Sequence, residues 1–253
     1  KKGPVTLILA EDEVELDTTI RHHLALGFKH TVVFAMPEFT IAQDVEDDII
    51  RVNYNMLIDA ALETAVNAVM KAAGDIWIYY CFNSEFLFFP FCEHRTVGEM
   101  IAFNVEERRD TILSYVVDFY TGDLLVNANA VCIEDAHLDK TGYYALARKD
   151  PWNNDLDRQL DFFGGLRWRF EEHIPVPRRR IDRVSIFRNK SGLVFYPDHT
   201  FSDPEYNTYA CSWHHTLTAA VYSFRTAKAL KRNPGSTFEI ETFKWHNSAP
   251  FEW

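Results

Sequence analysis

The chain has 253 residues, of which 47% are hydrophobic and 15% aromatic, and its formal net charge is -11. This composition is typical of a packed globular protein, and the acidic balance disfavours a nucleic-acid binder, whose surface is normally basic. No uncharged window reaches the roughly 18 apolar residues that a membrane helix requires. The four cysteines show no CxxC spacing, which argues against a zinc ribbon and favours a reducing cytoplasm.

Strand-like and helix-like segments alternate in the first third of the chain. Apolar and β-branched runs predict strands at residues 4–10, 30–35, 47–54 and 76–82. Amphipathic patterns predict helices at residues 11–27 and 55–75. This order is typical of an α/β sheet with helices on its faces, and the fully apolar run 76–82 is typical of a central parallel strand.

After residue 91 the pattern changes. It predicts a helix at 96–103, strands at 110–120 and 180–188, a helix at 216–233, and a long irregular stretch at 121–180. No internal repeat and no linker long enough to separate two domains is visible. We therefore expect one domain over residues 1–253, with two halves at 1–92 and 93–253.

Polar side chains follow several of the predicted strands. Glu11 follows the first strand, Glu38 the second, and the triplet Asn83-Ser84-Glu85 interrupts the apolar run "CFNSEFLFFPF". Ligands of open α/β sheets bind beyond the carboxyl ends of the strands. Glu85 is therefore expected at the functional end of a strand, the alternative being a surface turn with a solvated glutamate.

Three stretches resemble bacterial proteins related to glycosyltransferase family 2. "LILAEDEVELDTTIRHHLALGF" resembles their first strand, acidic turn and helix, and "WIYYCFNSEFLFFP" lies where they carry an Asp-x-Asp motif. "FFGGLRWRFEEH" resembles their Gly-Gly segment and the acidic region near the acceptor. The resemblance implies a GT-A-like α/β fold with a mixed, mostly parallel sheet. It also implies transfer of a sugar from a nucleotide-sugar donor, bound by the first half, to a glycan or lipid-linked acceptor.

The same resemblance implies roles for residues on the donor side. Glu85 would hold Mn²⁺ or Mg²⁺, cations that prefer oxygen ligands, although Asn83 replaces the expected first aspartate. Glu11 would lie near the nucleotide base. Gly164 and Gly165 would let a sugar or phosphate approach the backbone closely, the alternative being an ordinary turn.

Further residues are implied for catalysis and for charge neutralisation. Glu172 matches the base that deprotonates the acceptor hydroxyl, with Glu171 as a second candidate. Both could instead form an exposed turn paired with a nearby arginine. Arg180 could clamp a diphosphate or belong to a solvated edge. His215 is a candidate metal ligand, and a structural histidine is the alternative.

Two departures from the family pattern favour a rival hypothesis. The first is Asn83, and the second is the segment at residues 36 to 47, which lacks the usual loop and helix of the donor pocket. A degenerate family member would bind a nucleotide or glycan without turnover. A metal hydrolase built on the histidines ranks last, because the sequence has no HExxH or HxH spacing.

Overall fold

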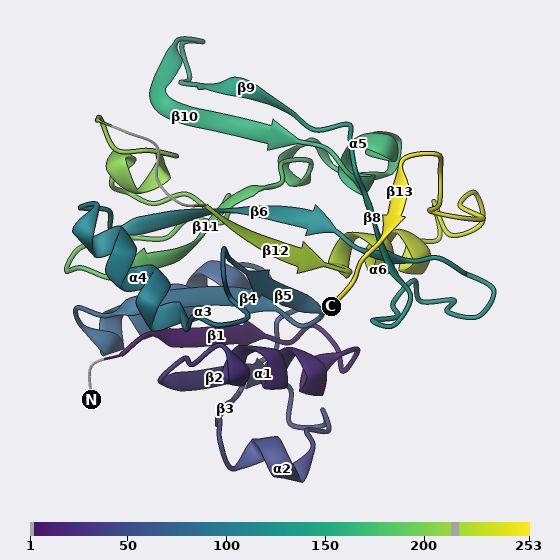
Figure 1. Cartoon of the computed structure of the whole chain (residues 1–253), viewed down its shortest axis with the longest axis horizontal. Coiled ribbons are helices and arrows are strands. Elements are labelled where there is room, and N and C mark those ends of the chain that lie inside the picture. Colours follow the sequence, from purple (N-terminus) through teal and green to yellow (C-terminus); the bar gives the residue numbers. More distant parts are fainter. Residues whose placement is uncertain (1–2, 214–217) are drawn as a thin grey trace. The chain divides into compact units, whose positions relative to one another are not determined.

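The computed structural model describes residues 3–213 and 218–253 (Figure 1). The chain forms two compact units. The first comprises Lys1–Ser114, Asp157–Gln159 and Arg183–Ala220, and the second comprises Tyr115–Leu156, Leu160–Asp182 and Val221–Trp253. The expected single domain, with halves meeting at residues 92 and 93, stays a prediction.

An eight-stranded sheet has the order β3-β2-β1-β4-β11-β6-β12-β5. Its strands are β1 (Val5–Leu9), β2 (His30–Ala35), β3 (Ile50–Asn53), β4 (Trp77–Phe82), β5 (Glu85–Phe88), β6 (Thr111–Asp118), β11 (Asp182–Arg188) and β12 (Ala219–Ser223). β1 pairs in parallel with β2 and β4, β2 pairs in parallel with β3, and β11 is antiparallel to β4. The order 3-2-1-4 is that of a nucleotide-binding α/β half. This confirms the predicted α/β class with a mixed, mostly parallel sheet.

The centre of the first unit is apolar on both faces of its sheet. All five residues of β1 are buried, and so are Ile78 to Phe82 of β4. Such continuous burial explains why both strands read as unbroken hydrophobic runs, since helices cover both sides of parallel strands.

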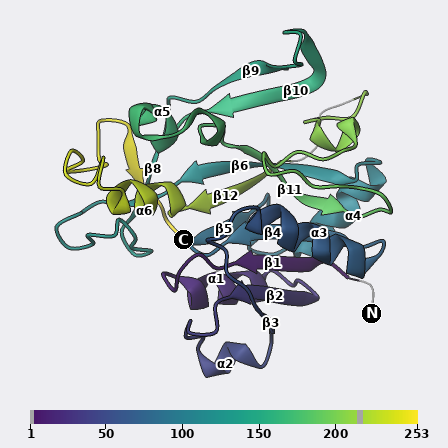
Figure 2. The same cartoon turned by 180° about the vertical axis from the view of Figure 1, so that it is seen from behind.

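Helices cover the sheet of the first unit on both faces. α1 (Leu16–Ala25) and α4 (Val97–Glu106) lie in front of the sheet in Figure 1, and α3 (Ala61–Ala73) lies in front in the reverse view of Figure 2. α4 begins at a capping box, in which Thr96 and Glu99 each accept a hydrogen bond from the other's backbone. A short helix, α2 (Gln43–Glu46), precedes β3. Among the described residues, no helix has the length and apolar character needed to cross a membrane.

The second unit has smaller sheets and short helices. β7 (Tyr120–Thr121), β8 (Ala136–Asp139) and β13 (Ser248–Pro250) form one sheet in the order β13-β8-β7, and β9 (Tyr144–Lys149) pairs with β10 (Asp155–Phe163). The helices are α5 (Leu166–Arg169) and α6 (Arg225–Arg232), and 3₁₀ turns cover Glu171–His173 (η1) and Val176–Arg178 (η2). Another 3₁₀ turn, Pro204–Asn207 (η3), belongs to the first unit. Tyr120, Leu166 and Phe243 are fully buried in the core of the second unit.

Two sequence predictions are wrong. The expected helix at 216–233 contains strand β12 followed by the short helix α6, because Ala219, Val221 and Ser223 alternate with less buried residues and form one face of a strand. The stretch 121–180 is not irregular, since it holds β8, β9, β10 and α5. Predicted strand 110–120 and helix 96–103 are confirmed as β6 and α4, and the helix expected at 55–75 begins only at Ala61.

Candidate functional site

The carboxyl ends of β1 and β4 lie side by side. The two strands run parallel, with Leu9 opposite Phe82, and the Asn83 N–H donates to the Leu9 carbonyl at 3.3 Å. The segments that leave these strands therefore meet at one edge of the sheet, where open α/β sheets bind ligands. The structure brings Glu11 and Asn83 together here, as the sequence predicts.

Asn83 fastens the loop that follows β1. Its side-chain Oδ1 accepts the Glu11 N–H at 2.9 Å, and its Nδ2 donates to Asp12 Oδ1 at 2.7 Å and to the Val14 carbonyl at 2.9 Å. Asn83 is fully buried. An aspartate here could accept the first of these hydrogen bonds but could not donate the other two. The amide therefore suits this position better than the carboxylate of the family motif.

Ser84 lies at the turn of the chain and also forms hydrogen bonds to the segment that follows β1. It has a positive φ of 63°, its N–H donates to Thr19 Oγ1 at 2.9 Å, and its hydroxyl donates to the Val14 carbonyl at 2.8 Å. The polar interruption of the hydrophobic run is thus a tight turn, and β5 begins at once with Glu85. The turn lies inside the protein, since all three of its residues are buried.

Glu85 forms an ion pair with Arg183 of β11. Arg183 NH2 lies 2.8 Å from Glu85 Oε2 and NH1 lies 3.4 Å from Oε1, and Oε2 also accepts the Phe82 N–H at 2.9 Å. The two side chains are only 1% and 4% exposed. Burial lowers the pKa of the Arg183 guanidinium, but Glu85 and the nearby tyrosines raise it by more, so the arginine stays charged. The Arg183 guanidinium also lies over the Tyr80 ring, 5.2 Å from its centre.

The residues around Glu85 do not fit a divalent metal ion. Mg²⁺ requires about six oxygen ligands in octahedral geometry and usually keeps several waters, whereas the Glu85 carboxylate is buried against a guanidinium and a backbone N–H. Among the described residues no group of three or more His, Cys, Asp or Glu side chains is arranged to hold a metal. His215 lies outside the described residues.

The outer rim of this edge carries the acidic loop of β1. Glu11 and Asp12 are partly exposed, and Glu13 is exposed and accepts the Thr40 N–H at 2.6 Å. Asp17 accepts the Ala42 N–H at 2.9 Å, so the segment after β2 is tied to the loop and first helix that follow β1. Arg51 holds the same segment from β3 by donating to three of its backbone carbonyls. The expectation that residues 36 to 47 lack a helix is wrong, since the segment contains α2 (Gln43–Glu46). These hydrogen bonds hold the segment at the rim.

Gly164 and Gly165 lie in the second unit, between β10 and α5. A Cβ at Gly164 would lie 2.2 Å from the Tyr143 ring, and one at Gly165 would lie 3.0 Å from the Asp118 carboxylate. Asp118 is buried and accepts the Arg167 N–H at 3.2 Å. Burial raises the pKa of the Asp118 carboxyl despite the neighbouring Arg167. Close packing of a ring and a carboxylate explains the two glycines without a ligand.

Glu171 and Glu172 begin the 3₁₀ turn η1 and are both exposed. Glu171 pairs with Arg179 at 3.3 Å. Glu172 lies 3.8 Å from the His173 ring, on a side chain that is 62% exposed. The carboxylate of Glu172 is thus accessible to an acceptor, and the two glutamates lie in a different unit from Glu85. That they share one cleft with Glu85 stays a prediction.

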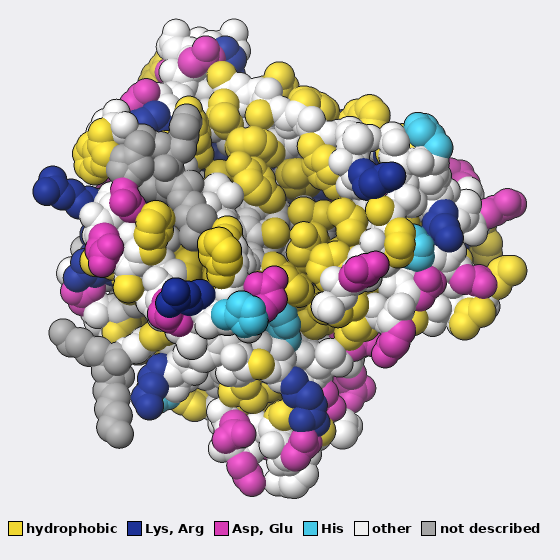
Figure 3. All heavy atoms as spheres, in the orientation of Figure 1, with side chains coloured by type: hydrophobic (Ala, Val, Ile, Leu, Met, Phe, Trp, Pro, Cys, Tyr) yellow, Lys and Arg dark blue, Asp and Glu magenta, His cyan; other side chains and the backbone are white. Residues whose placement is uncertain are grey.

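Most of the Lys and Arg side chains in the basic run between residues 166 and 190 are paired with acidic groups, and these ion pairs range from buried to exposed. Arg180 pairs with Asp161 at 3.0 Å, and other members pair with acidic groups: Arg167 with Asp118, Arg169 with Asp139, Arg179 with Glu171, Arg183 with Glu85, Arg188 with Asp75, and Lys190 with Asp203. On the face shown in Figure 3, basic side chains are scattered among acidic ones and form no continuous patch. Arg180 is thus held in an ion pair with Asp161 rather than lying on a solvated edge, and its contact with a diphosphate stays a prediction.

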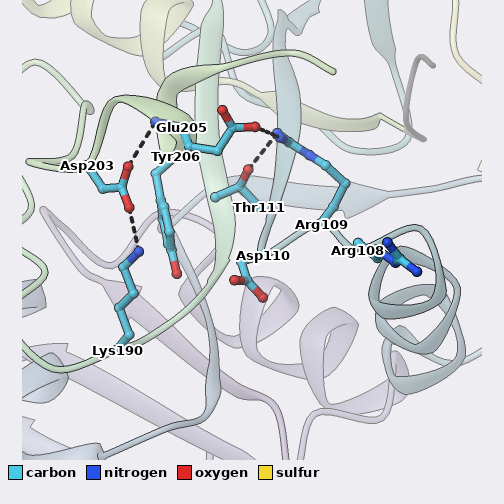
Figure 4. Close-up of a pocket in the computed structure, with 8 residues that line it drawn as sticks. All are labelled: Arg108, Arg109, Asp110, Thr111, Lys190, Asp203, Glu205 and Tyr206. Atoms are coloured by element: carbon cyan, nitrogen blue, oxygen red, sulfur yellow. Dashed lines mark hydrogen bonds and ion pairs between the residues drawn. The ribbon is translucent and has the colours of Figure 1, made fainter. Parts of the chain in front are cut away.

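A pocket of about 100 Å³ lies in the first unit, away from the predicted edge. It is lined by Arg108, Arg109, Asp110, Thr111, Lys190, Asp203, Glu205 and Tyr206 (Figure 4). Arg109 pairs with Glu205, and Lys190 with Asp203, so much of its charge is neutralised within the pocket wall. Arg188 lies opposite Trp77, the first residue of β4, which places the nearby Lys190 at the amino end of that strand. None of the residues predicted from the sequence lines this pocket.

Sequence reasoning missed the specific roles of two residues. Arg183 was visible only as one member of the basic run, and nothing in the sequence marks it as the partner of Glu85. Asp118 is the last residue of β6 and lies near the end of the predicted strand 110–120, so it carries a similar signal to Glu85, an acidic group beside a strand end. That signal could have drawn attention to it.

No protein-family model matches the chain, and neither does any curated protein. Among solved structures, a 4-diphosphocytidyl-2C-methyl-D-erythritol synthase matches with 12% identity and a TM-score of 0.33, covering 75% of each chain. The structure of S. aureus TarS 1-349 matches with 12% identity and a TM-score of 0.37, covering 91% of this chain and 63% of that chain. The chain thus spans less than two thirds of TarS 1-349. Values this low say nothing about activity, and the fold assignment rests on the strand order.

Proposed function

We propose that the chain is a glycosyltransferase that uses a nucleotide-sugar donor and a glycan or lipid-linked acceptor. The observation that carries the proposal is the ordered acidic loop at the carboxyl end of β1, beside the end of β4, in a sheet of order 3-2-1-4. Sheets of this order bind nucleotides at that edge. The resemblance of the sequence to family 2 supplies the reaction class.

In the proposed reaction, the acceptor hydroxyl attacks the anomeric carbon of the donor sugar. A new carbon–oxygen bond forms while the bond to the diphosphate breaks, and the diphosphate leaves with its electron pair. Glu172 accepts the hydroxyl proton, with Glu171 as the second candidate. Glu11 lies at the nucleotide side of the rim. A divalent cation bound elsewhere, with His215 as one ligand, would add neutralising charge to the leaving diphosphate.

A member that binds a nucleotide without turnover is the second candidate function. It is favoured by the inward hydrogen bonds of Asn83 and the buried ion pair of Glu85, which leave the family's acidic motif without an open carboxylate. Such a protein would keep the nucleotide edge but lose the transfer chemistry.

A thermal-shift screen of common sugar nucleotides, run in EDTA and again with Mn²⁺, tests the proposal. We expect at least one sugar nucleotide to raise the melting temperature. If it is also slowly hydrolysed, the Glu172→Gln variant should lose hydrolysis and keep the thermal shift. Binding without hydrolysis under either condition supports the second candidate. No shift with any sugar nucleotide would refute both.

A further inference from the structure

The three side chains of the Asn83-Ser84-Glu85 turn are directed into the protein. The Asn83 side chain makes three hydrogen bonds, the Ser84 hydroxyl makes one, and both Glu85 oxygens face Arg183. All three residues are at most 1% exposed. A metal-binding turn would instead present its oxygens to the ligand, with open positions for water and phosphate.

The turn holds one short segment in place. Asn83 and Ser84 together bond the backbone at Glu11 and Val14 and the side chain of Asp12. Asp12 Oδ1 accepts the Val14 N–H at 3.0 Å, which closes the loop on itself. The conformation of the loop from Glu11 to Val14 thus depends on a residue about 70 positions away in the sequence.

Arg183 supplies the charge that the turn needs. Burying a carboxylate without a partner is strongly unfavourable, and a hydrogen-bonded guanidinium compensates for it. The pair joins the first residue of β5 to β11, and therefore fixes one end of the turn. A divalent cation at Glu85 would have to displace this guanidinium inside a nearly dry site.

We infer that Asn83 and the Glu85–Arg183 pair are positioning residues that form an internal clasp. The clasp holds the loop from Glu11 to Val14 in the conformation that the structure shows. Arg183 takes the place at Glu85 that a divalent cation would occupy, so Glu85 would hold no cation for a nucleotide bound at this edge. The statement about the nucleotide rests on the proposed function, while the clasp itself does not.

The first test measures binding of Mn²⁺ alone, by electron paramagnetic resonance, to the wild-type chain and to Glu85→Gln. We expect the two proteins to bind the same amount of Mn²⁺, whether that amount is zero or reflects a site elsewhere. Stoichiometric binding by the wild type that is lost in Glu85→Gln would overturn the inference.

The second test needs neither metal nor an intact ion pair. In Asn83→Ala, the Glu11 amide loses its acceptor, and we expect its hydrogen exchange to speed up about tenfold, as suits one lost hydrogen bond. The Leu7 amide in β1 reports the change in global stability, and the Glu11 amide should speed up by more than the Leu7 amide does. Unchanged exchange at Glu11 would show that Asn83 does not hold the loop. Because neither test contains a nucleotide, a failure here is distinguishable from failure of the proposed function.

Discussion

Replacing Arg183 with methionine should cost far more stability than an ordinary surface substitution. Methionine keeps much of the side-chain volume but removes the guanidinium that neutralises the buried Glu85 carboxylate. Breaking a buried ion pair in this way typically costs about 3–5 kcal/mol. Arg188→Met is the matched control, because Arg188 lies on the same strand in an ion pair with Asp75 that is 42% and 56% exposed. Exposed pairs contribute about 0–1 kcal/mol.

Urea unfolding at neutral pH would measure the free energies of unfolding of Arg183→Met and Arg188→Met relative to the wild type. A second variant, Glu85→Gln with Arg183→Met, removes the buried charge and keeps an acceptor for the Phe82 N–H, so it should recover most of the loss. The loss of unfolding free energy in Arg183→Met should become smaller in acid, because protonation of Glu85 removes the unpaired charge. The loss should become larger as the pH rises. Equal losses for Arg183→Met and Arg188→Met would refute the reasoning.

Two further predictions concern buried groups elsewhere. Burial is the main cause, and the neighbouring His22 the second, of a pKa of His23 that is lowered to about 3. His23 therefore takes up its proton only on unfolding, and stability should fall by about 2 kcal/mol between pH 7.5 and 5. His23→Gln should flatten that dependence in urea titrations, and an unchanged slope would show that other groups cause it. Gly164→Ala should lose about 1–3 kcal/mol more than Gly192→Ala, because only the former meets a ring, and equal melting temperatures would contradict this.

The central strands of the sheet were predictable because a strand buried on both faces has a continuous apolar run in the sequence. β1 and β4 follow this rule. β12 does not, because its Ala-Ala-Val-Tyr-Ser segment is equally compatible with a helix, and only alternate burial in the sheet decides between them. The sequence did not predict the strands of the second unit for the same reason, because their residues adopt strand geometry through tertiary pairing.

The contact between Glu11 and Asn83 was predictable from the sequence, but the partner of Glu85 was not. Parallel pairing of β1 and β4 places Glu11 beside Asn83, and a strand-order argument anticipates this. Whether Glu85 faces a ligand or a counter-ion depends on Arg183, which lies 98 positions away. No local pattern encodes such a contact. A buried arginine and a solvated arginine look alike in a sequence.

Titration of nucleoside diphosphates into the labelled protein in EDTA, followed through the backbone amide signals of residues 11 to 14, tests the central claim most directly. We predict that one nucleoside diphosphate shifts these signals in a saturable manner. Any effect of added Mn²⁺ on this response should be the same in Glu85→Gln as in the wild type. Signals that stay in place with every nucleotide would contradict a nucleotide site at this edge. Shifts that require both Mn²⁺ and an intact Glu85 would contradict the clasp.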